Sequence, residues 1–338
     1  MADLAPTGLA TPRQGVGRST GRPAPRPSAS ASDPHRRRQR RDASALARGQ
    51  RRLFLPFVSA ALLLYTLFFI LPALYSAYAS FTEWDGINAP QGNGLDNFKA
   101  LLNDPVFRTT FTNTLLVLFV VGGTIFALSF GFLLVLREMR GNRFVRSVIF
   151  LPHVVSTIVL AIFWGYLLRY DGLVNNALGT VGVEPVKWIG PKSAFPAIMV
   201  GLVWINIGYY VMILMAGVDR IPAYYYEDAM LAGANAWQKL RHVTLPLSWD
   251  IVGVAAVLWT ISSVKIFEFN YAFGAAGGYP PPAYEWTAAV FVYAQTVGNN
   301  PPPYRFGYAC ASAIVMLLLV VFFVVALRRL MRRETIEF

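Results

Sequence analysis

Polar side chains that could handle a solute lie inside two long apolar stretches of this sequence. They are Asn206, Tyr209 and Tyr210 in residues 194–217, and Lys265, Glu268, Asn270 and Tyr271 in residues 248–273. Amide, ammonium and carboxylate groups exchange hydrogen bonds with hydroxyl groups, and aromatic rings offer flat apolar faces. This combination suits a polyhydroxylated solute such as a sugar. We expect these side chains to line a solute path. For Tyr209 and Tyr210 the alternative is packing or a place in an interfacial aromatic belt, and for Asn206 and Glu268 it is a gate or a structural pair.

Lys265 and Glu268 are three residues apart, so on a continuous helix they would share a face and could pair with each other. Residues of the kind that enzymes use are scattered. Cys310 is the only cysteine, and His35, His153 and His242 are far apart in the chain. We find no Gly-rich phosphate loop and no nucleophile elbow. We therefore predict no catalytic residues and no metal site, and favour transport over enzymatic activity.

Six apolar stretches dominate the composition. The chain of 338 residues is 55% hydrophobic and 14% charged, which leaves little charge for the surface of a soluble protein. Each stretch is long enough to cross a hydrocarbon core, which takes about 20 helical residues, and only helices satisfy the backbone there. The sequence predicts an all-α membrane protein with six transmembrane helices. The predicted spans are residues 53–80, 110–136, 147–168, 194–217, 248–273 and 305–327.

Basic residues predict the orientation. They concentrate in the N-terminal tail, in the loop after the second span, in residues 218–247 and after the last span. These four segments fall on one side of six spans, and the positive-inside rule places that side in the cytoplasm. Both termini are therefore predicted to be cytoplasmic, in a multi-pass protein of the cytoplasmic (inner) membrane. The net charge of +12 then requires no nucleic-acid partner.

Residues 1–52 differ in composition from the rest of the chain. They are rich in Arg, Pro, Ser, Ala and Gly and lack apolar periodicity, so we predict a disordered basic cytoplasmic tail. The runs at 36–38 and 40–41 could bind anionic membrane lipid, but a solvated tail that sets the topology is the simpler interpretation. The six-helix domain is then residues 53–330, followed by a short cytoplasmic tail, residues 331–338.

A polar segment separates the fourth and fifth spans. It resembles the EAA loop of the membrane-spanning subunits of ABC importers: Glu-Ala-Ala, three residues, Gly, nine residues, Ile-x-Leu-Pro. The matching positions are Glu227, Ala229, Gly233, Leu245 and Pro246, while Asp228 replaces an Ala and Val243 replaces the Ile.

Shorter motifs extend the resemblance over about residues 53–330. They are Phe81-Thr-Glu-Trp84, Asn113-Thr114, Phe150-Leu-Pro-His153, Lys265-Ile-Phe-Glu-Phe269 and Gly277-Gly278. In this order they are similar to the maltose-permease-like member of carbohydrate-importer permease pairs. Tyr279 and the proline runs at 280–282 and 301–303 depart from the pattern, in a loop that would face a binding protein.

The resemblance implies a type I ABC importer permease with the MetI-like architecture. It also implies partners: a second homologous permease, two ATPase subunits, an extracytoplasmic solute-binding protein and a sugar substrate. ATP and Mg²⁺ would belong to the ATPase, so we expect no cofactor on this chain. Residues 218–247 would form the coupling loop. The expected ATPase-coupling residues are Glu227, Asp228, Ala229, Gly233, Leu245 and Pro246.

The chemistry of this loop fits a rigid docking element. Gly233 stands where a helix–turn–helix needs a positive φ. Glu227 and Asp228 suit the positive end of a first short helix, and Pro246 would fix the angle at which the fifth span begins. The alternative is an ordinary interfacial helix with a glycine kink.

Other function classes remain open at this stage. A secondary transporter would need no ATPase, but such carriers usually have Gly/Pro breaks at matching places in two repeats, and no repeat is evident here. A membrane scaffold would not need the polar residues of the fifth span. Within the ABC class, glycerol phosphate or an amino acid is the alternative to a sugar, for which we expect an oligosaccharide.

Overall fold

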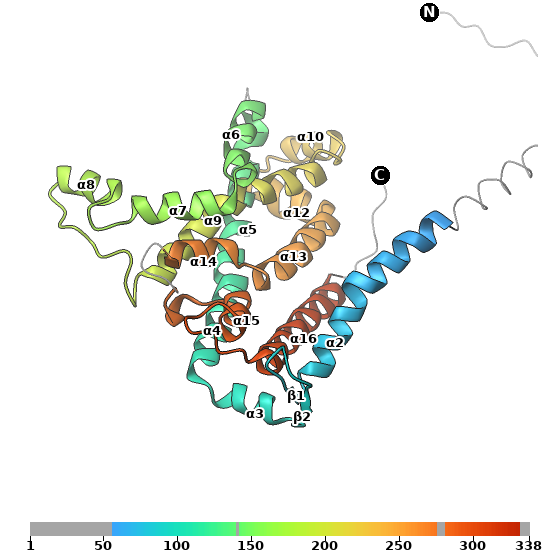
Figure 1. Cartoon of the computed structure of the whole chain (residues 1–338). Helices are drawn as coiled ribbons and strands as arrows, with labels where there is room; N and C mark the ends of the chain where they lie inside the picture. Colours follow the sequence, from blue (N-terminus) through green and yellow to red (C-terminus); the bar gives the residue numbers. More distant parts are fainter. Residues whose placement is uncertain (1–55, 140–141, 276–280, 332–338) are drawn as a thin grey trace, which may run out of the picture. The chain divides into compact units, whose positions relative to one another are not determined.

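The structure is a computed structural model in which residues 56–139, 142–275 and 281–331 are described (Figure 1). The predicted N-terminal tail, residues 1–52, lies outside these ranges. So does the predicted C-terminal tail, residues 331–338, except for Met331. The chain divides into two compact units, Met1–Phe68 and Phe69–Phe338. In the first unit, residues 56–68 are helical. The elements discussed below belong to the second unit, except for the beginning of the first helix.

Four helices among the described residues are long and apolar enough to cross a membrane. They are Pro56–Ala79, Pro105–Leu136, Ala194–Val218 and Phe306–Leu330. The first ends in η1 (Thr66–Ile70) and α2 (Leu71–Ala79), and the second contains α4 (Pro105–Leu116), η2 (Val117–Val121) and α5 (Gly122–Glu138). The other two are α9 (Ala194–Val218) and α16 (Phe306–Leu330). They coincide with the first, second, fourth and sixth predicted spans.

The third predicted span is bent, and a second bend lies where the predicted fifth span begins. The helical stretch 143–154 of α6 (Asn142–Val154) meets α7 (Thr157–Leu167) at 94°, and Ala236–Leu247 meets α13 (Trp249–Val264) at 78°. By length and composition, the described part of the chain therefore has four candidate spans, or up to six if each bent pair counts as one. Pro152 lies inside α6 just before the first bend, where its ring prevents a regular helix.

The predicted fifth span, residues 248–273, is not one helix. α13 ends at Val264, and α14 (Glu268–Ala275) begins after a short break. The Ile266 carbonyl in this break accepts a hydrogen bond of 2.7 Å from the Thr287 hydroxyl. A helix break inside an apolar segment is tolerated where other groups satisfy the freed backbone in this way. Because Thr287 is distant in the sequence, local patterns do not reveal the break.

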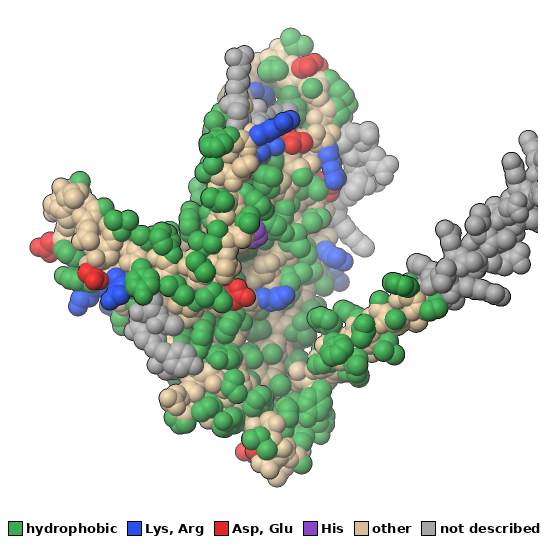
Figure 2. All heavy atoms as spheres, turned by 45° about the horizontal axis from the view of Figure 1, so that its top comes forward, with side chains coloured by type: hydrophobic (Ala, Val, Ile, Leu, Met, Phe, Trp, Pro, Cys, Tyr) green, Lys and Arg blue, Asp and Glu red, His purple; other side chains and the backbone are tan. Residues whose placement is uncertain are grey.

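α9 forms the centre of the second unit. It packs against α5, α6, α13 and α14, and its side chains Tyr210, Ile198 and Leu214 are buried. α2 and α16 pack side by side (Figure 1). Large apolar side chains such as Leu318 and Phe322 of α16 are exposed, and hydrophobic side chains spread over much of the face shown in Figure 2. Such a surface suits contact with lipid.

Short elements connect these helices. The strands β1 (Thr82–Glu83) and β2 (Gln91–Gly92) pair antiparallel, with Thr82 opposite Gly92. The remaining connecting elements are α3 (Asp96–Asn103), α8 (Leu173–Thr180), η4 (Ala283–Glu285) and α15 (Ala288–Thr296). The Asn113 amide of α4 donates to the carbonyls of Tyr284 and Trp286, at 2.9 and 3.0 Å, and so ties η4 to α4.

Candidate functional site

An open cavity of about 450 Å³ surrounds the break between α13 and α14, and we call it the polar cavity. Asn206, Lys265 and Glu268, which the sequence predicts on the solute path, all line it. Its full lining is His153, Thr157, Leu202, Ile205, Asn206, Ser262, Lys265, Ile266, Phe267, Glu268 and Phe269. α6, α7, α9, α13 and α14 therefore all contribute to one polar space.

Lys265 and Glu268 do not form an ion pair; the three pairs found among the described residues join other side chains. Lys265 terminates α13, and Glu268 is the first residue of α14, so the two residues are on different helices. The same-face geometry that the spacing predicts on one helix is absent because the helix breaks between them. Both charged groups are exposed and face the cavity region with their hydrogen-bonding capacity available for a solute.

A second open cavity of about 600 Å³ adjoins the first, because Phe267 and Glu268 line both. We call it the aromatic cavity, since Tyr166, Phe267 and Tyr271 line it together with Arg169. The rings of Phe267 and Tyr271 are stacked, with centroids 5.1 Å apart. Ile158, Ile162 and Ala272 complete the lining. Flat aromatic faces next to charged groups are the surfaces on which the C–H face and the hydroxyl groups of a sugar can bind.

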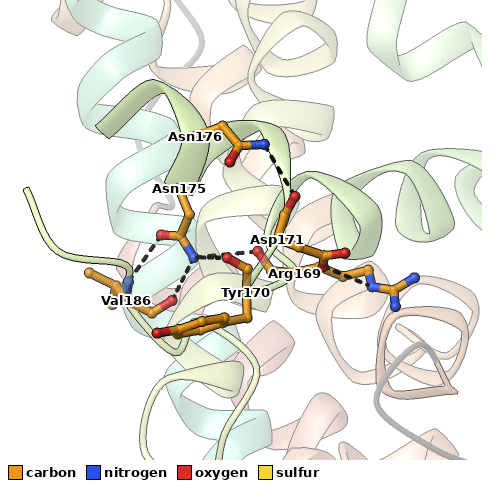
Figure 3. A network of polar contacts seen from close by, with 6 residues as sticks. All are labelled: Arg169, Tyr170, Asp171, Asn175, Asn176 and Val186. Atoms are coloured by element: carbon orange, nitrogen blue, oxygen red, sulfur yellow. Dashed lines mark hydrogen bonds and ion pairs between the residues drawn. The ribbon is translucent and has the colours of Figure 1, made fainter. Parts of the chain in front are cut away.

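Arg169 is held at this cavity by the segment that follows α7 (Figure 3). Its guanidinium lies 3.6 Å from the Asp171 carboxylate and stacks over the Tyr166 ring at 5.5 Å. The buried Asn175 amide donates to the carbonyls of Tyr170 and Val186, at 3.1 and 2.9 Å. Its oxygen accepts from the Val186 amide at 3.0 Å. One buried side chain therefore crosslinks this segment and limits how far Arg169 can move.

Three of the predicted path residues do not line either cavity. Tyr210 is 1% exposed and packs edge-on against Trp259, and Asn270 is 1% exposed and donates to the Glu285 carbonyl at 3.3 Å. Tyr209 stacks on His153 with ring centroids 4.6 Å apart, so it lies behind the polar cavity and supports its wall. Tyr209 and Tyr210 therefore occupy packing positions, whereas Tyr271 lines the aromatic cavity.

His153 is a cavity residue that the sequence prediction left out. Its ring lines the polar cavity, and its buried Nδ1 has no hydrogen-bond partner. Its place follows from the bend between α6 and α7, which begins just after it and puts Thr157 on the same wall. The sequence did carry a signal, because His153 is an ionisable residue inside an apolar stretch, and such residues usually face the protein interior or a water-filled cavity.

Residues Tyr224–Thr244 form a second candidate site, which we call the helix hairpin. It consists of α10 (Tyr224–Leu231), α11 (Ala236–Lys239) and η3 (Leu240–Thr244), and α12 (Leu245–Leu247) continues it. Gly233 has φ of 78°, a left-handed conformation that glycine adopts without strain. Asn235 and Gln238 form a capping box that starts the second arm. The Tyr226 and Thr244 hydroxyls, 3.1 Å apart and buried, join the two arms.

The hairpin exposes apolar side chains near its turn. Leu231 is 88% exposed, Trp237 61% and Met230 56%. Glu227 lies in the first turn of α10, and both Glu227 and Asp228 are exposed beside these residues. Ala229 is half-buried, Leu245 begins α12 and Pro246 follows it. Exposed apolar groups rimmed by charge mark a surface suited to bind another protein.

Comparisons with known proteins identify the family. A family model described as the inner membrane component of binding-protein-dependent transport systems matches residues 123–336. A probable ABC transporter permease of Pyrococcus horikoshii is 31% identical over 268 residues, which cover 77% of this chain and 88% of that protein. The diacetylchitobiose uptake permease NgcF of Streptomyces coelicolor is 27% identical, over 86% of this chain and 83% of that protein.

The fold also matches a solved structure. The structure of a bacterial ABC transporter involved in the import of the acidic polysaccharide alginate matches with a TM-score of 0.71 and 21% sequence identity. The match covers 86% of this chain and 100% of that chain. The predicted MetI-like architecture and the predicted membrane location agree with these matches. This chain belongs to the family of inner membrane components of binding-protein-dependent transport systems, the permeases of ABC transporters.

Proposed function

We propose that this chain is the transmembrane permease subunit of an ABC importer that carries an oligosaccharide across the cytoplasmic membrane. The observation that supports it most directly is the continuity of the polar and aromatic cavities through Phe267 and Glu268. Stacked aromatic rings and separated charged groups, with a neutral amide nearby, provide both kinds of contact that a sugar uses. Relatives named for sugar uptake agree with this choice of solute.

The family and the helix hairpin support a set of proposed partners. The importer contains a second, homologous permease, two ATPase subunits and an extracytoplasmic binding protein. The hairpin docks on an ATPase through Leu231, Trp237 and Met230, with Glu227 and Asp228 at the rim. ATP and Mg²⁺ bind to the ATPase, and this permease holds no nucleotide.

The proposed transport step uses the way the hairpin continues into the cavity. The chain runs from η3 through α12 and the 78° bend into α13, whose far end carries Ser262 and Lys265 in the polar cavity. When the ATPases close on ATP, displacement of the hairpin is carried along α13 and changes the access to this cavity. The positive-inside rule supports a cytoplasmic position for the hairpin and for both termini.

The proposal is tested by isolating the complex and measuring transport. The chain is affinity-purified in mild detergent from its native membrane, and the co-purifying proteins are identified by mass spectrometry. The complex and its binding protein are then placed in liposomes with radiolabelled diacetylchitobiose, maltose, lactose or glycerol 3-phosphate. We expect a second permease and an ATPase, and ATP-dependent uptake of a disaccharide.

Other outcomes would replace the proposal. ATP-dependent uptake of glycerol 3-phosphate alone would keep the ABC mechanism and change the solute class. Uptake by the isolated chain without ATP would identify a secondary transporter.

A further inference from the structure

The second span contains a π-helical segment whose backbone receives a side chain from α13. η2 (Val117–Val121) lies between α4 and α5, and the Leu118 carbonyl within it accepts a hydrogen bond of 2.9 Å from the Trp259 indole N–H. π-helical segments are rare and often mark functional positions in helices. Trp259 is 3% exposed, so water does not compete for this bond.

Gly122 brings the two helices together at this point. A Cβ atom at position 122 would lie 2.1 Å from Trp259 Nε1 and 2.6 Å from its Cδ1. The indole therefore lies directly against the backbone of the second span, and any side chain at Gly122 would displace it. The contact combines a glycine of α5, an accepting carbonyl of η2 and a tryptophan of α13.

Aromatic packing connects this contact to the wall of the polar cavity. Trp259 packs edge-on against Tyr210, with ring centroids 5.7 Å apart, and Tyr210 packs edge-on against Tyr209 at 5.2 Å. Tyr209 in turn stacks on His153, which lines the polar cavity. Rings in direct contact transmit displacement because protein interiors are densely packed.

The position of Trp259 along α13 is also informative. The helix begins at Trp249, next to the bend that follows the hairpin, about 15 Å along the axis from Trp259. Ser262 and Lys265, both on the polar cavity, follow Trp259 within two turns. The contact with η2 thus lies between the end of α13 that is joined to the hairpin and the end that carries cavity residues.

We propose that Trp259 is a positioning residue whose contact with Leu118 and Gly122 forms the pivot of α13. This inference rests on the proposed function. Displacement of the hairpin at one end of α13 turns the helix about this contact and moves Ser262 and Lys265 at the other end. Without the contact, hairpin displacement is absorbed by sliding of α13, and ATP is hydrolysed with less solute moved.

The test compares two tryptophans that each donate an indole hydrogen bond to a carbonyl on another helix. Trp259→Phe removes the bond to Leu118, and Trp164→Phe, the matched control, removes the 3.0 Å bond from α7 to the Ala197 carbonyl of α9. The complete complex with its binding protein is placed in liposomes, with the disaccharide that the wild-type complex transports. Thermal stability and the number of sugars transported per ATP hydrolysed are measured for each.

We expect similar losses of thermal stability in both variants, and a fall in sugars per ATP for Trp259→Phe alone. The expected fall is about fivefold. A typical buried hydrogen bond contributes about 1 kcal/mol, and losing that energy changes an equilibrium constant by about this factor. Gly122→Ala, which displaces the indole, is expected to act in the same direction. An unchanged ratio in Trp259→Phe, or an equal fall in Trp164→Phe, overturns the pivot.

If Trp259→Phe fails to assemble into the complex, a tryptophan analogue of the same shape takes its place. Incorporation of 3-benzothienylalanine at position 259 exchanges the indole N–H for sulfur and keeps the two rings, so it removes only the donor. An unchanged ratio in that protein also overturns the pivot. If the wild-type complex itself shows no ATP-dependent sugar uptake, the proposed function fails; if it transports and the variants stay coupled, only the pivot fails.

Discussion

Lys265 and Glu268 are individually exposed charges at the break between α13 and α14, and neither is paired with the other. At membrane depth an unpaired charge is expensive, so such residues are kept where they contact water or a polar solute. The ammonium can donate to sugar hydroxyl groups and the carboxylate can accept from them. Because the two groups are on different helices, each can contact a different part of a solute.

At this scale we predict that Lys265→Ala and Glu268→Ala each reduce the initial rate of disaccharide uptake about tenfold. The reason is that a hydrogen bond to a charged group contributes roughly 1.5–3 kcal/mol. Glu184→Ala, at an exposed position between α8 and α9, is the control. Uptake is measured in liposomes with saturating binding protein, and the amount of co-purified ATPase is expected to be unchanged. Normal uptake in both variants would show that neither Lys265 nor Glu268 contacts the solute during transport.

Glu285 allows a prediction about pH. Its side chain is 1% exposed and its Oε2 has no hydrogen-bond partner; burial raises the pKa of this carboxyl from 4.5 to about 7. The unfolded chain ionises above pH 4.5 while the folded protein still holds the proton, so stability falls as pH rises to about 7 and is constant above it. Burial also raises the pKa of the neighbouring Tyr284, which therefore stays neutral over this range.

We therefore expect Glu285→Gln to be more stable than the wild type at pH 8, by about 3 kcal/mol, and equal to it near pH 4. The measurement is thermal unfolding of the chain in detergent between pH 4 and pH 8. Glu83→Gln, at an exposed position, should leave the wild-type pH dependence in place. If the stability of Glu285→Gln fell with rising pH as much as that of the wild type, Glu285 would not be the group responsible for the pH dependence.

At the scale of elements, the helix hairpin depends on its turn. Gly233 and Gly182 both have left-handed backbones, with φ of 78° and 83°, and a Cβ at either position would meet open space. Alanine in this conformation costs roughly 1 kcal/mol at each position. Gly233→Ala and Gly182→Ala should therefore lose similar thermal stability.

Only Gly233→Ala should weaken ATPase binding, because only Gly233 lies in the proposed docking element. We expect the dissociation constant for the ATPase to rise about fivefold, as a change of roughly 1 kcal/mol implies. Binding of purified ATPase to the permease complex in lipid nanodiscs provides the measurement. Equal binding by both variants would show that the turn does not position the docking surface.

Elements also show what could be predicted from the sequence. Uninterrupted apolar stretches such as α9 and α16 are located correctly because length and composition determine a span. The break at Lys265 is not, because it depends on a distant partner, the Thr287 hydroxyl. The bends after α6 and at Ser248 are not predicted either, although Pro152 lies just before the first. The same limit applies to the predicted path residues. Asn206 is polar and does line the polar cavity, whereas Tyr210 and Asn270 have suitable chemistry but are buried in the protein interior.

At the scale of the whole molecule, buried amides hold distant segments together. Asn113 joins α4 to η4 by donating to the carbonyls of Tyr284 and Trp286. We predict that Asn113→Ala lowers the free energy of unfolding by about 2 kcal/mol, because two buried carbonyls lose their amide donor. Asn176→Ala removes a single exposed bond to the Asp171 carbonyl and is expected to have little effect. Thermal unfolding in detergent distinguishes the two, and equal stability would contradict the role of Asn113.

The partners of Asn113 also constrain how the protein is made. Asn113 and the Tyr284 carbonyl are 171 residues apart, so a ribosome adding 5–20 residues per second needs about ten to thirty seconds to supply the second after the first. Throughout that interval the second span is already synthesised, yet its amide lacks the carbonyls that it binds in the finished protein. The order of synthesis and the order of assembly therefore differ: α4 is made early but reaches its final contacts only after most of the chain has left the ribosome.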